Sequence, residues 1–381
     1  MSNMYIPEMS ITNAINELAT IYIPLINGNS AYSSIPSPFL WGPPGVGKSD
    51  GINELAELLS ARTGKKVIVT DIRLLLFSPI DLRGVPVADE NRQFTDWLKP
   101  RILDLNPSKD IVNILFLDEL SAAPQSVQAA AYQLTLNRTI GEHKLPDNTL
   151  VMAAGNRTTD RAVAYKMPSA LANRMMHYDI CVDFKTWAQW AIEKGNIHPY
   201  VLGYLSYDMS KLYLEDKSID EVAFPTPRSW MFVSNILNTL GEIDDISKCH
   251  SIISSCIGLG TTVEFLAWSK VYKDLPKTED IFKGKAVNYP GSPDALYALI
   301  GSMTTYVCRR EKDSDSNGLS STEIENVCRF CSSIPADYAM SFYLNIIGME
   351  SIRLKLMKCS CFMEWGKKHK RALTSAGYSV A

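Results

Sequence analysis

The stretch Phe39-Leu40-Trp41-Gly42-Pro43-Pro44-Gly45-Val46-Gly47-Lys48-Ser49 decides the fold of this chain. Its second part matches the phosphate-binding pattern G-x-x-x-x-G-K-[ST] at every position. Glycines let backbone N–H groups approach a polyphosphate closely, because they lack a Cβ atom and can adopt positive φ angles. Lys48 supplies a positive charge for the β- and γ-phosphates, and the Ser49 hydroxyl can bind Mg²⁺. The predicted nucleotide-binding residues are Gly42, Pro43, Pro44, Gly45, Val46, Gly47, Lys48 and Ser49.

The residues on either side of this loop support the prediction. Ser37 to Trp41 is a short apolar run, typical of a buried strand. Beyond Lys48, apolar residues recur at helical spacing from Ile52 to Leu59, so the loop leads into a helix whose positive end points at the phosphates. An ordinary glycine-proline turn is the alternative. It does not explain why Lys and Ser follow the last glycine.

A second chemical signature follows the apolar run Ile111 to Leu117, which is predicted to be a parallel strand covered on both faces. The run ends in Asp118 and Glu119. A carboxylate at a strand end beside the phosphate loop can hold Mg²⁺, largely through water, and the next carboxylate can polarise the attacking water. An acidic helix N-terminus that complements the helix dipole is the alternative interpretation.

A third polar residue stands at the end of another apolar run. Residues 149–154 are predicted to form a strand, and Asn156 follows it. The amide of Asn156 can orient the hydrolytic water and contact the γ-phosphate. The alternative is a turn residue that caps the next segment.

The whole pattern predicts an α/β fold in which five apolar strands alternate with helices to form a parallel sheet. The predicted strands are residues 37–41, 66–70, 111–117, 149–154 and 177–182. Ligands bind such sheets at the carboxyl ends of the strands, where the loop, Asp118 and Asn156 are expected to converge. Residues 79–97 are expected to form an inserted hairpin. Helical patterns replace strands after Phe184. The predicted domains are 1–37 (helix and linker), 38–183 (α/β domain), 184–275 (helical lid) and 276–381 (C-terminal helical region).

Composition narrows the function classes. The chain has 381 residues, 46% of them apolar and 21% charged, and a net charge of −3, which gives no general attraction to nucleic acid. It shows neither a membrane span nor a secretory leader pattern, so we expect a cytoplasmic protein without a membrane partner. The pair Cys328 and Cys331 has the spacing of zinc ligands, but the pair lies in a helical pattern without a second ligand pair. Reduced buried thiols are the favoured interpretation.

Taken in order, these segments resemble an AAA+ ATPase of the MoxR-like branch. The resemblance covers about residues 30–240 and includes the loop at Leu75–Val87. Its motif segments are Gly42–Ser49 (Walker A), Ile114–Glu119 (Walker B), Ala153–Asn156 (sensor one), Met167–Arg174, and Pro225–Arg228 (sensor two).

The resemblance implies roles for individual residues. ATP and Mg²⁺ are the implied cofactors, with Ser49 and Asp118 holding the metal, Glu119 activating water and Asn156 positioning it. Arg228 is expected to reach the γ-phosphate from the helical lid, where the alternative is a surface arginine. Arg174 resembles the arginine finger that a neighbouring subunit presents. The alternative is a cation at the C-terminus of a helix, where it complements the helix dipole. Two other residues compete for the finger role, Arg161 and Arg157.

A finger supplied by another subunit implies an oligomer, and for this family most often a hexameric ring. MoxR-like proteins often remodel or mature protein complexes with a separate partner that carries a von Willebrand factor A domain. We therefore expect a ring ATPase with a protein client. Two alternatives stay open, a nucleic-acid-translocating motor and a scaffold gated by slow nucleotide turnover.

Overall fold

The computed structural model describes residues 6–28, 30–160, 165, 167–168, 172–214, 222–241, 246–272, 275–312 and 318–370. The chain divides into two compact units, residues 1–182 and residues 183–381. Across the described ranges, no helix is both long and apolar enough to cross a lipid bilayer.

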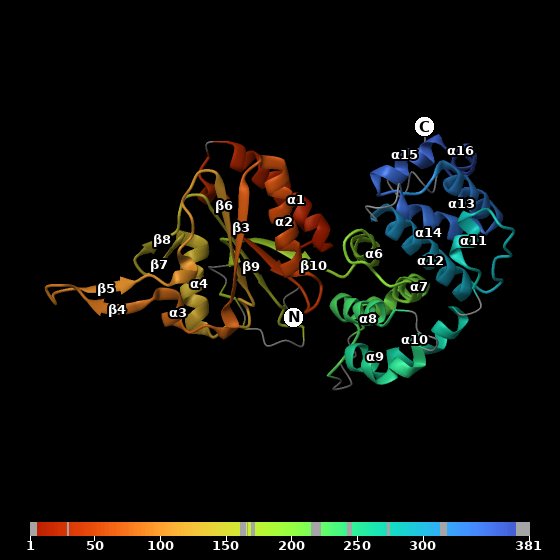
Figure 1. The fold of residues 1–381 in the computed structure, drawn as a ribbon. Helices are drawn as coiled ribbons and strands as arrows, with labels where there is room; N and C mark the ends of the chain where they lie inside the picture. Colours follow the sequence, from red (N-terminus) through yellow and green to blue (C-terminus); the bar gives the residue numbers. More distant parts are fainter. Residues whose placement is uncertain are drawn as a thin grey trace. The chain divides into compact units, whose positions relative to one another are not determined.

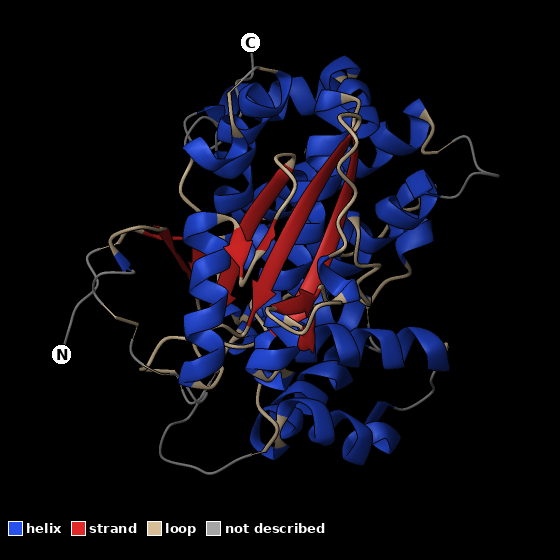
Figure 2. Ribbon diagram, turned by 90° about the vertical axis from the view of Figure 1, so that its left-hand side faces the viewer, coloured by secondary structure: helices blue, strands red, loops and turns tan. Residues whose placement is uncertain are grey.

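The first unit is built on a six-stranded sheet in which every strand runs parallel to its neighbours. Figure 2 shows its strands side by side, in red. The order of strands is β1 (Glu8–Met9), β10 (Met176–Ile180), β2 (Pro38–Trp41), β9 (Thr149–Gly155), β6 (Ile111–Asp118) and β3 (Lys66–Arg73). All five predicted strands are present. The sixth, β1, was not predicted, because two residues are too few to show a periodic pattern.

The registry places β9 between the phosphate-loop strand and the strand that carries Asp118. Phe39 of β2 pairs with Ala153 of β9, and Leu117 of β6 pairs with the same Ala153. The carboxyl ends of these three strands therefore lie at one edge of the sheet. This is the convergence that the sequence predicted.

Helices cover both faces of the sheet (Figure 1). Helices α1 (Ile11–Asn27) and α2 (Lys48–Thr63) lie on one face, and α4 (Gln125–Asn137) lies on the other. Strand β6 shows why both faces are needed. Its side chains alternate, with Ile114 and Phe116 in the core under α1 and α2, and Leu115 and Leu117 in the core under α4.

Short elements complete this unit. The predicted insertion is confirmed as an antiparallel hairpin of β4 (Val85–Ala88) and β5 (Thr95–Leu98), which follows α3 (Pro79–Arg83) and extends away from the sheet in Figure 1. A second antiparallel pair consists of β7 (Thr139–Ile140) and β8 (His143–Lys144). The 3-10 turns of the unit are η1 (Tyr32–Ser34), η2 (Leu74–Leu76) and η3 (Arg101–Leu103).

The described residues of the second unit form helices joined by loops, with no strand among them. It contains α6 (Phe184–Glu193), α7 (Pro199–Tyr207), η4 (Met209–Leu212), α8 (Pro227–Leu240), η5 (Ile246–Cys249), α9 (His250–Ile257), α10 (Leu259–Tyr272), α11 (Thr278–Phe282), α12 (Pro293–Lys312), α13 (Ser321–Ser333), α14 (Ala336–Ile346), α15 (Glu350–Lys358) and α16 (Ser360–Lys368). Helix α12 packs against both α7 and α14, and so joins the earlier and later helices of the unit. The predicted fold class, a phosphate-loop parallel sheet followed by helices, is confirmed. The boundaries predicted within each unit stay predictions.

Candidate nucleotide site

The glycine loop connects β2 to α2 and has the backbone shape that its sequence predicts. Gly45 and Gly47 adopt φ angles of 81° and 88°, in the left-handed region. A Cβ atom at Gly47 would meet nothing within 4 Å, so the space in front of this backbone is open. Gly42 is needed for another reason, because a Cβ there would lie 2.8 Å from the carbonyl oxygen of Ile180. The loop therefore leaves the backbone of Gly47 uncovered at the start of α2.

Lys48 links this loop to the end of β9. Its side chain is buried, and its Nζ donates hydrogen bonds to the carbonyl oxygens of Gly42 at 2.6 Å and Pro43 at 3.0 Å. It also donates to Oδ1 of Asn156 at 3.1 Å. The lysine and the asparagine are 108 positions apart in the chain. The fold therefore brings together two residues that were predicted from separate sequence signals.

Ser49 and Asp118 form the second contact of the site. The Ser49 Oγ donates to Oδ2 of Asp118 at 2.7 Å, and Asp118 as a whole residue is 8% exposed. Oδ1 of Asp118 accepts a hydrogen bond from the backbone N–H of Glu119 at 2.8 Å. Asp118 therefore has one oxygen directed at the helix that carries the phosphate loop, and its orientation is held from both sides.

Glu119 has an uncommon backbone conformation. Its φ angle is 57°, a left-handed value that costs a non-glycine residue about 1–2 kcal/mol. Its carbonyl oxygen accepts hydrogen bonds from the N–H groups of Ala122 and Ala123, at 3.0 Å and 3.2 Å, which hold the turn in place. Such strain is concentrated at functional sites, and here it turns the chain sharply at the end of β6.

Two hydrogen bonds to backbone carbonyl oxygens hold Asn156 at the end of β9. The Ser121 Oγ donates to the Asn156 carbonyl oxygen at 2.9 Å, and the Gly42 N–H donates to the carbonyl oxygen of Gly155 at 3.3 Å. These bonds connect the asparagine both to the turn after β6 and to the first glycine of the loop. Its amide is thereby fixed where it meets Lys48.

The three candidate arginine fingers have different surroundings. Arg157 is anchored within its own sheet, because it pairs with Asp179 and Asp160 and donates to the Ile180 carbonyl oxygen at 3.0 Å. Arg174 is exposed and lies in a turn just before β10. Arg161 is outside the described residues, as is part of the segment Met167–Arg174.

Arg228 lies in the second unit, in the first turn of α8, as the sequence predicted. The helix begins with Pro227 after the cap Thr226, whose side chain accepts from the Ser229 N–H. The arginine side chain is exposed. Its proposed contact with a γ-phosphate stays a prediction.

One acidic residue near Asp118 and Glu119 was not among the residues predicted from the sequence. Asp71 lies on β3, which continues three residues beyond the predicted end at Thr70. Partial burial raises the pKa of Asp71, and the negative charges of Asp118 and Glu119 raise it further, while Arg73 lowers it. Asp71 is polar and interrupts the apolar run, so the hydrophobic pattern predicted an end of the strand three residues before the observed end at Arg73. A signal was present in Ile72, which continues the strand alternation beyond it.

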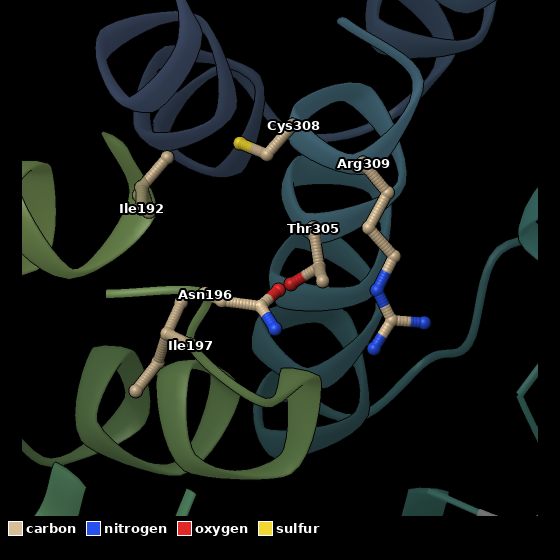
Figure 3. A pocket seen from close by; sticks show the side chains of 6 residues that line it. All are labelled: Ile192, Asn196, Ile197, Thr305, Cys308 and Arg309. Atoms are coloured by element: carbon tan, nitrogen blue, oxygen red, sulfur yellow. The ribbon is translucent and has the colours of Figure 1, made fainter. Parts of the chain in front are cut away.

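Two further features lie in the second unit, a group of cysteines and a small pocket. Burial raises the pKa of Cys331 to about 12, and it also raises that of Cys328, as do nearby Cys359 and Cys331. Within the described ranges, no three or more His, Cys, Asp and Glu side chains are grouped to hold a metal ion. A small pocket shown in Figure 3 is lined by Ile192, Asn196, Ile197, Thr305, Cys308 and Arg309. These lining residues include neither a carboxylate nor an imidazole for acid–base chemistry.

The residues of the first unit fit a nucleotide triphosphate with Mg²⁺. Mg²⁺ binds oxygen ligands and usually takes one or two carboxylates together with phosphates and waters. The hydroxyl of Ser49 and the carboxylate of Asp118 are such a pair, located beside the open backbone of Gly47. When bound, the metal supplies charge neutralisation at the phosphates. Lys48 and the N-terminus of α2 supply positive charge from the protein.

The comparisons with known proteins gave distant similarities. No protein-family model and no curated protein matches the chain. PCH-2 from C. elegans is 13% identical with a TM-score of 0.34, over 79% of this chain and 70% of that one. A single-residue mutant of RuvB from Thermotoga maritima is 15% identical with a TM-score of 0.36, over 77% and 83%. NtrX from Brucella abortus, in complex with ADP, is 12% identical with a TM-score of 0.37, over 97% and 68%. At these TM-scores, only the residues of this chain carry weight for its function.

Proposed function

We propose that this chain is a Mg²⁺-dependent ATPase of the AAA+ class. The observation that supports it most is the meeting of two pairs at one sheet edge, Lys48 with Asn156 and Ser49 with Asp118. Each pair joins the phosphate loop to a different strand. A structural turn needs neither contact, whereas phosphoryl transfer needs a cation, metal ligands and a water-positioning amide within reach of one another.

The protein residues have distinct tasks in this proposal. Backbone N–H groups of the loop and Lys48 bind the phosphates. Ser49 and Asp118 hold Mg²⁺, the latter largely through water. Glu119 accepts a proton from the attacking water, and Asn156 orients that water. Arg228 reaches the γ-phosphate from the helical lid.

Within the class, we place the chain in the MoxR-like branch, acting as a ring, most simply a hexamer, that remodels or matures a protein complex. Arg174 completes the site of the neighbouring subunit. Its exposure supports this role, and the anchoring of Arg157 by Asp179 disfavours the competitor. The partner with a von Willebrand factor A domain is a separate chain.

The inserted segment supports a protein client over a nucleic acid. The inserted segment 79–97 together with the neighbouring Lys99 carries three cations, Arg83, Arg92 and Lys99, against the four carboxylates Asp81, Asp89, Glu90 and Asp96. Lys99 is also paired with Asp104 at 3.1 Å. The same segment exposes large apolar side chains, with Phe94 73% and Ile80 58% exposed. Apolar side chains on a segment of net negative charge suit contact with protein rather than with a polyanion.

The Glu119→Gln variant tests the proposal. It keeps the size of the side chain and removes the proton acceptor, so we expect ATP to bind with unchanged affinity while steady-state turnover falls about 10²–10⁴-fold. Glu142→Gln, an exposed position on the turn between β7 and β8, is the matched control with normal turnover. Normal turnover of Glu119→Gln would refute the assigned role. A single-turnover rate for the unchanged protein below about one event per hour would favour the slow scaffold instead.

A further inference from the structure

A histidine outside the phosphate motifs connects the loop strand to the turn that carries Arg174. His177 lies on β10, in register with Phe39 of β2. Its Nδ1 is 2.9 Å from the indole Nε1 of Trp41, the residue directly before Gly42. The rings of Phe39 and Trp41 are stacked with centroids 4.1 Å apart, and the His177 ring lies 6.1 Å from that of Trp41. The imidazole therefore belongs to an aromatic group beneath the phosphate loop.

The two contacts of this imidazole determine its tautomer. An indole N–H can only donate, so Nδ1 of His177 must be the acceptor of the Trp41 bond. The ring proton of the neutral imidazole is then on Nε2, which donates to the carbonyl oxygen of Ala172 at 2.7 Å. Both ring nitrogens are thus used, each in one fixed role.

The carbonyl oxygen of Ala172 also closes the turn around Arg174. It accepts the backbone N–H of Met175 at 3.3 Å, so Arg174 lies inside a turn whose first carbonyl is held by His177. The arginine side chain itself is exposed, and its own turn is the element that directs it. A change at the imidazole can therefore reach Arg174 through one hydrogen bond.

We propose that His177 is a positioning residue which, as the Nε2–H tautomer, holds the Ala172–Met175 turn against Trp41 and so orients Arg174. This inference rests on the proposed function, in which Arg174 completes the site of a neighbouring subunit. Through Trp41 the same residue connects the finger of one subunit to the phosphate loop of that subunit. His177 touches no nucleotide in this arrangement and acts only through Ala172 and Arg174.

Two substitutions separate the two bonds. The amide nitrogen of His177→Gln can replace Nε2 and donate to Ala172, whereas the shorter His177→Asn retains only an acceptor near Trp41. We expect His177→Asn to lower kcat about tenfold or more, with ATP affinity changed by less than about twofold. His177→Gln should recover most of the lost kcat. His250→Asn in α9 is the control, and equal losses in the Asn and Gln variants would overturn the role of the Ala172 bond.

Mixing variants shows through which site His177 acts. Protomers with His177→Asn keep an intact phosphate loop, and Lys48→Ala protomers keep a correctly held Arg174. Mixtures of the slowed His177→Asn protein with the inactive Lys48→Ala protein should hydrolyse ATP faster than the sum of the two proteins measured separately, because some subunit interfaces then combine an intact phosphate loop with a correctly held Arg174. If a mixture of Arg174→Ala with Lys48→Ala regains activity and the His177→Asn mixture does not, His177 acts on its own phosphate loop and the inference is wrong. If neither mixture regains activity, the shared site of the proposed function has failed.

The tautomer is measured without any ATPase assay. Selective ¹⁵N labelling of the five histidines, with His177 assigned by the signal that His177→Gln removes, reports which ring nitrogen carries the proton. We expect a single Nε2–H form with Nδ1 as acceptor, altered in Trp41→Phe. An Nδ1–H form, or a mixture of tautomers, overturns the inference whether or not the chain hydrolyses ATP. Thermal unfolding of each variant shows that it is folded.

Discussion

The Oγ atom of Ser49 lies 2.7 Å from Oδ2 of Asp118, although 69 positions separate the two residues. One residue stands in the first turn of α2 and the other at the end of β6. Their meeting depends on β9, which lies between β2 and β6 and sets the distance between the two strand ends. A hydroxyl and a carboxylate at this separation can share one hard cation.

Asp118→Asn tests this pair. The amide keeps the shape and can still bond to Ser49, but it removes the negative charge that favours a divalent cation. We expect the Mg²⁺ concentration for half-maximal ATPase activity to rise about 10–100-fold, while Mg²⁺-free nucleotide binding is unchanged. The first quantity is measured by ATPase assays over a series of MgCl₂ concentrations, and the second by nucleotide binding without Mg²⁺. Asp110→Asn, at the exposed opposite end of β6, is the control and should need the same Mg²⁺ concentration for half-maximal activity as the unchanged protein.

Gly155→Ala tests the close approach at the end of β9. A Cβ at this position would clash with the Ser121 Oγ and lie 3.0 Å from Cζ of Phe39, so these side chains or the strand must shift. We expect a loss of about 1–3 kcal/mol in the free energy of unfolding, together with weaker ATP turnover because Asn156 moves. Urea unfolding measures the loss. In the control Gly260→Ala, the added Cβ meets nothing within 4 Å, and stability should not fall.

Replacement of Arg157 by alanine should lower stability, whereas replacement of Arg174 should lower ATP turnover. Arg157→Ala leaves Asp179, whose side chain is 10% exposed, without its main cation, and we expect a loss of stability of about 3 kcal/mol. Arg174→Ala removes an exposed side chain and should leave the melting temperature unchanged while abolishing ATP turnover. Differential scanning fluorimetry beside an ATPase assay distinguishes the two. Unchanged stability of Arg157→Ala would show that its ion pairs are not structural.

Glu311 makes the second unit sensitive to acid. Burial alone would raise the pKa of Glu311, but hydrogen bonds from Ser351, the Leu319 N–H and Lys355 lower it below its ordinary 4.5. Because the pKa is lower in the folded state, the carboxylate stabilises the fold fully above pH 4.5 and loses this contribution as the pH falls through the lowered pKa. We expect the melting temperature of Glu311→Gln to be lower than that of the unchanged chain at pH 7. The gap should shrink as the pH falls below 4.5, and a constant gap would contradict the assignment.

The places of the phosphate loop, Asp118, Glu119 and Asn156 at the ends of strands could be predicted from sequence because their signals are local, whereas their catalytic roles stay predictions. A glycine pattern, or a polar residue directly after an apolar run, is visible within about ten positions. The strand β1 and the end of β3 at Arg73 could not be predicted, because one is too short and the other contains Asp71 in its apolar alternation. The anchoring of Arg157 joins residues 22 positions apart across two strands, and no local pattern indicates it.

The sequence by itself determined which segments are strands and helices and which residues stand at their ends, since hydrophobic periodicity and glycine conformation act over a few neighbouring residues. Tertiary structure alone decided that β9 lies between β2 and β6, that Lys48 reaches Asn156, and that Trp41 bonds to His177 across 136 positions. The physical reason is that the order of strands is selected by the packing of whole sheet faces against helices. That packing depends on the entire core at once, and no single stretch of the chain encodes it.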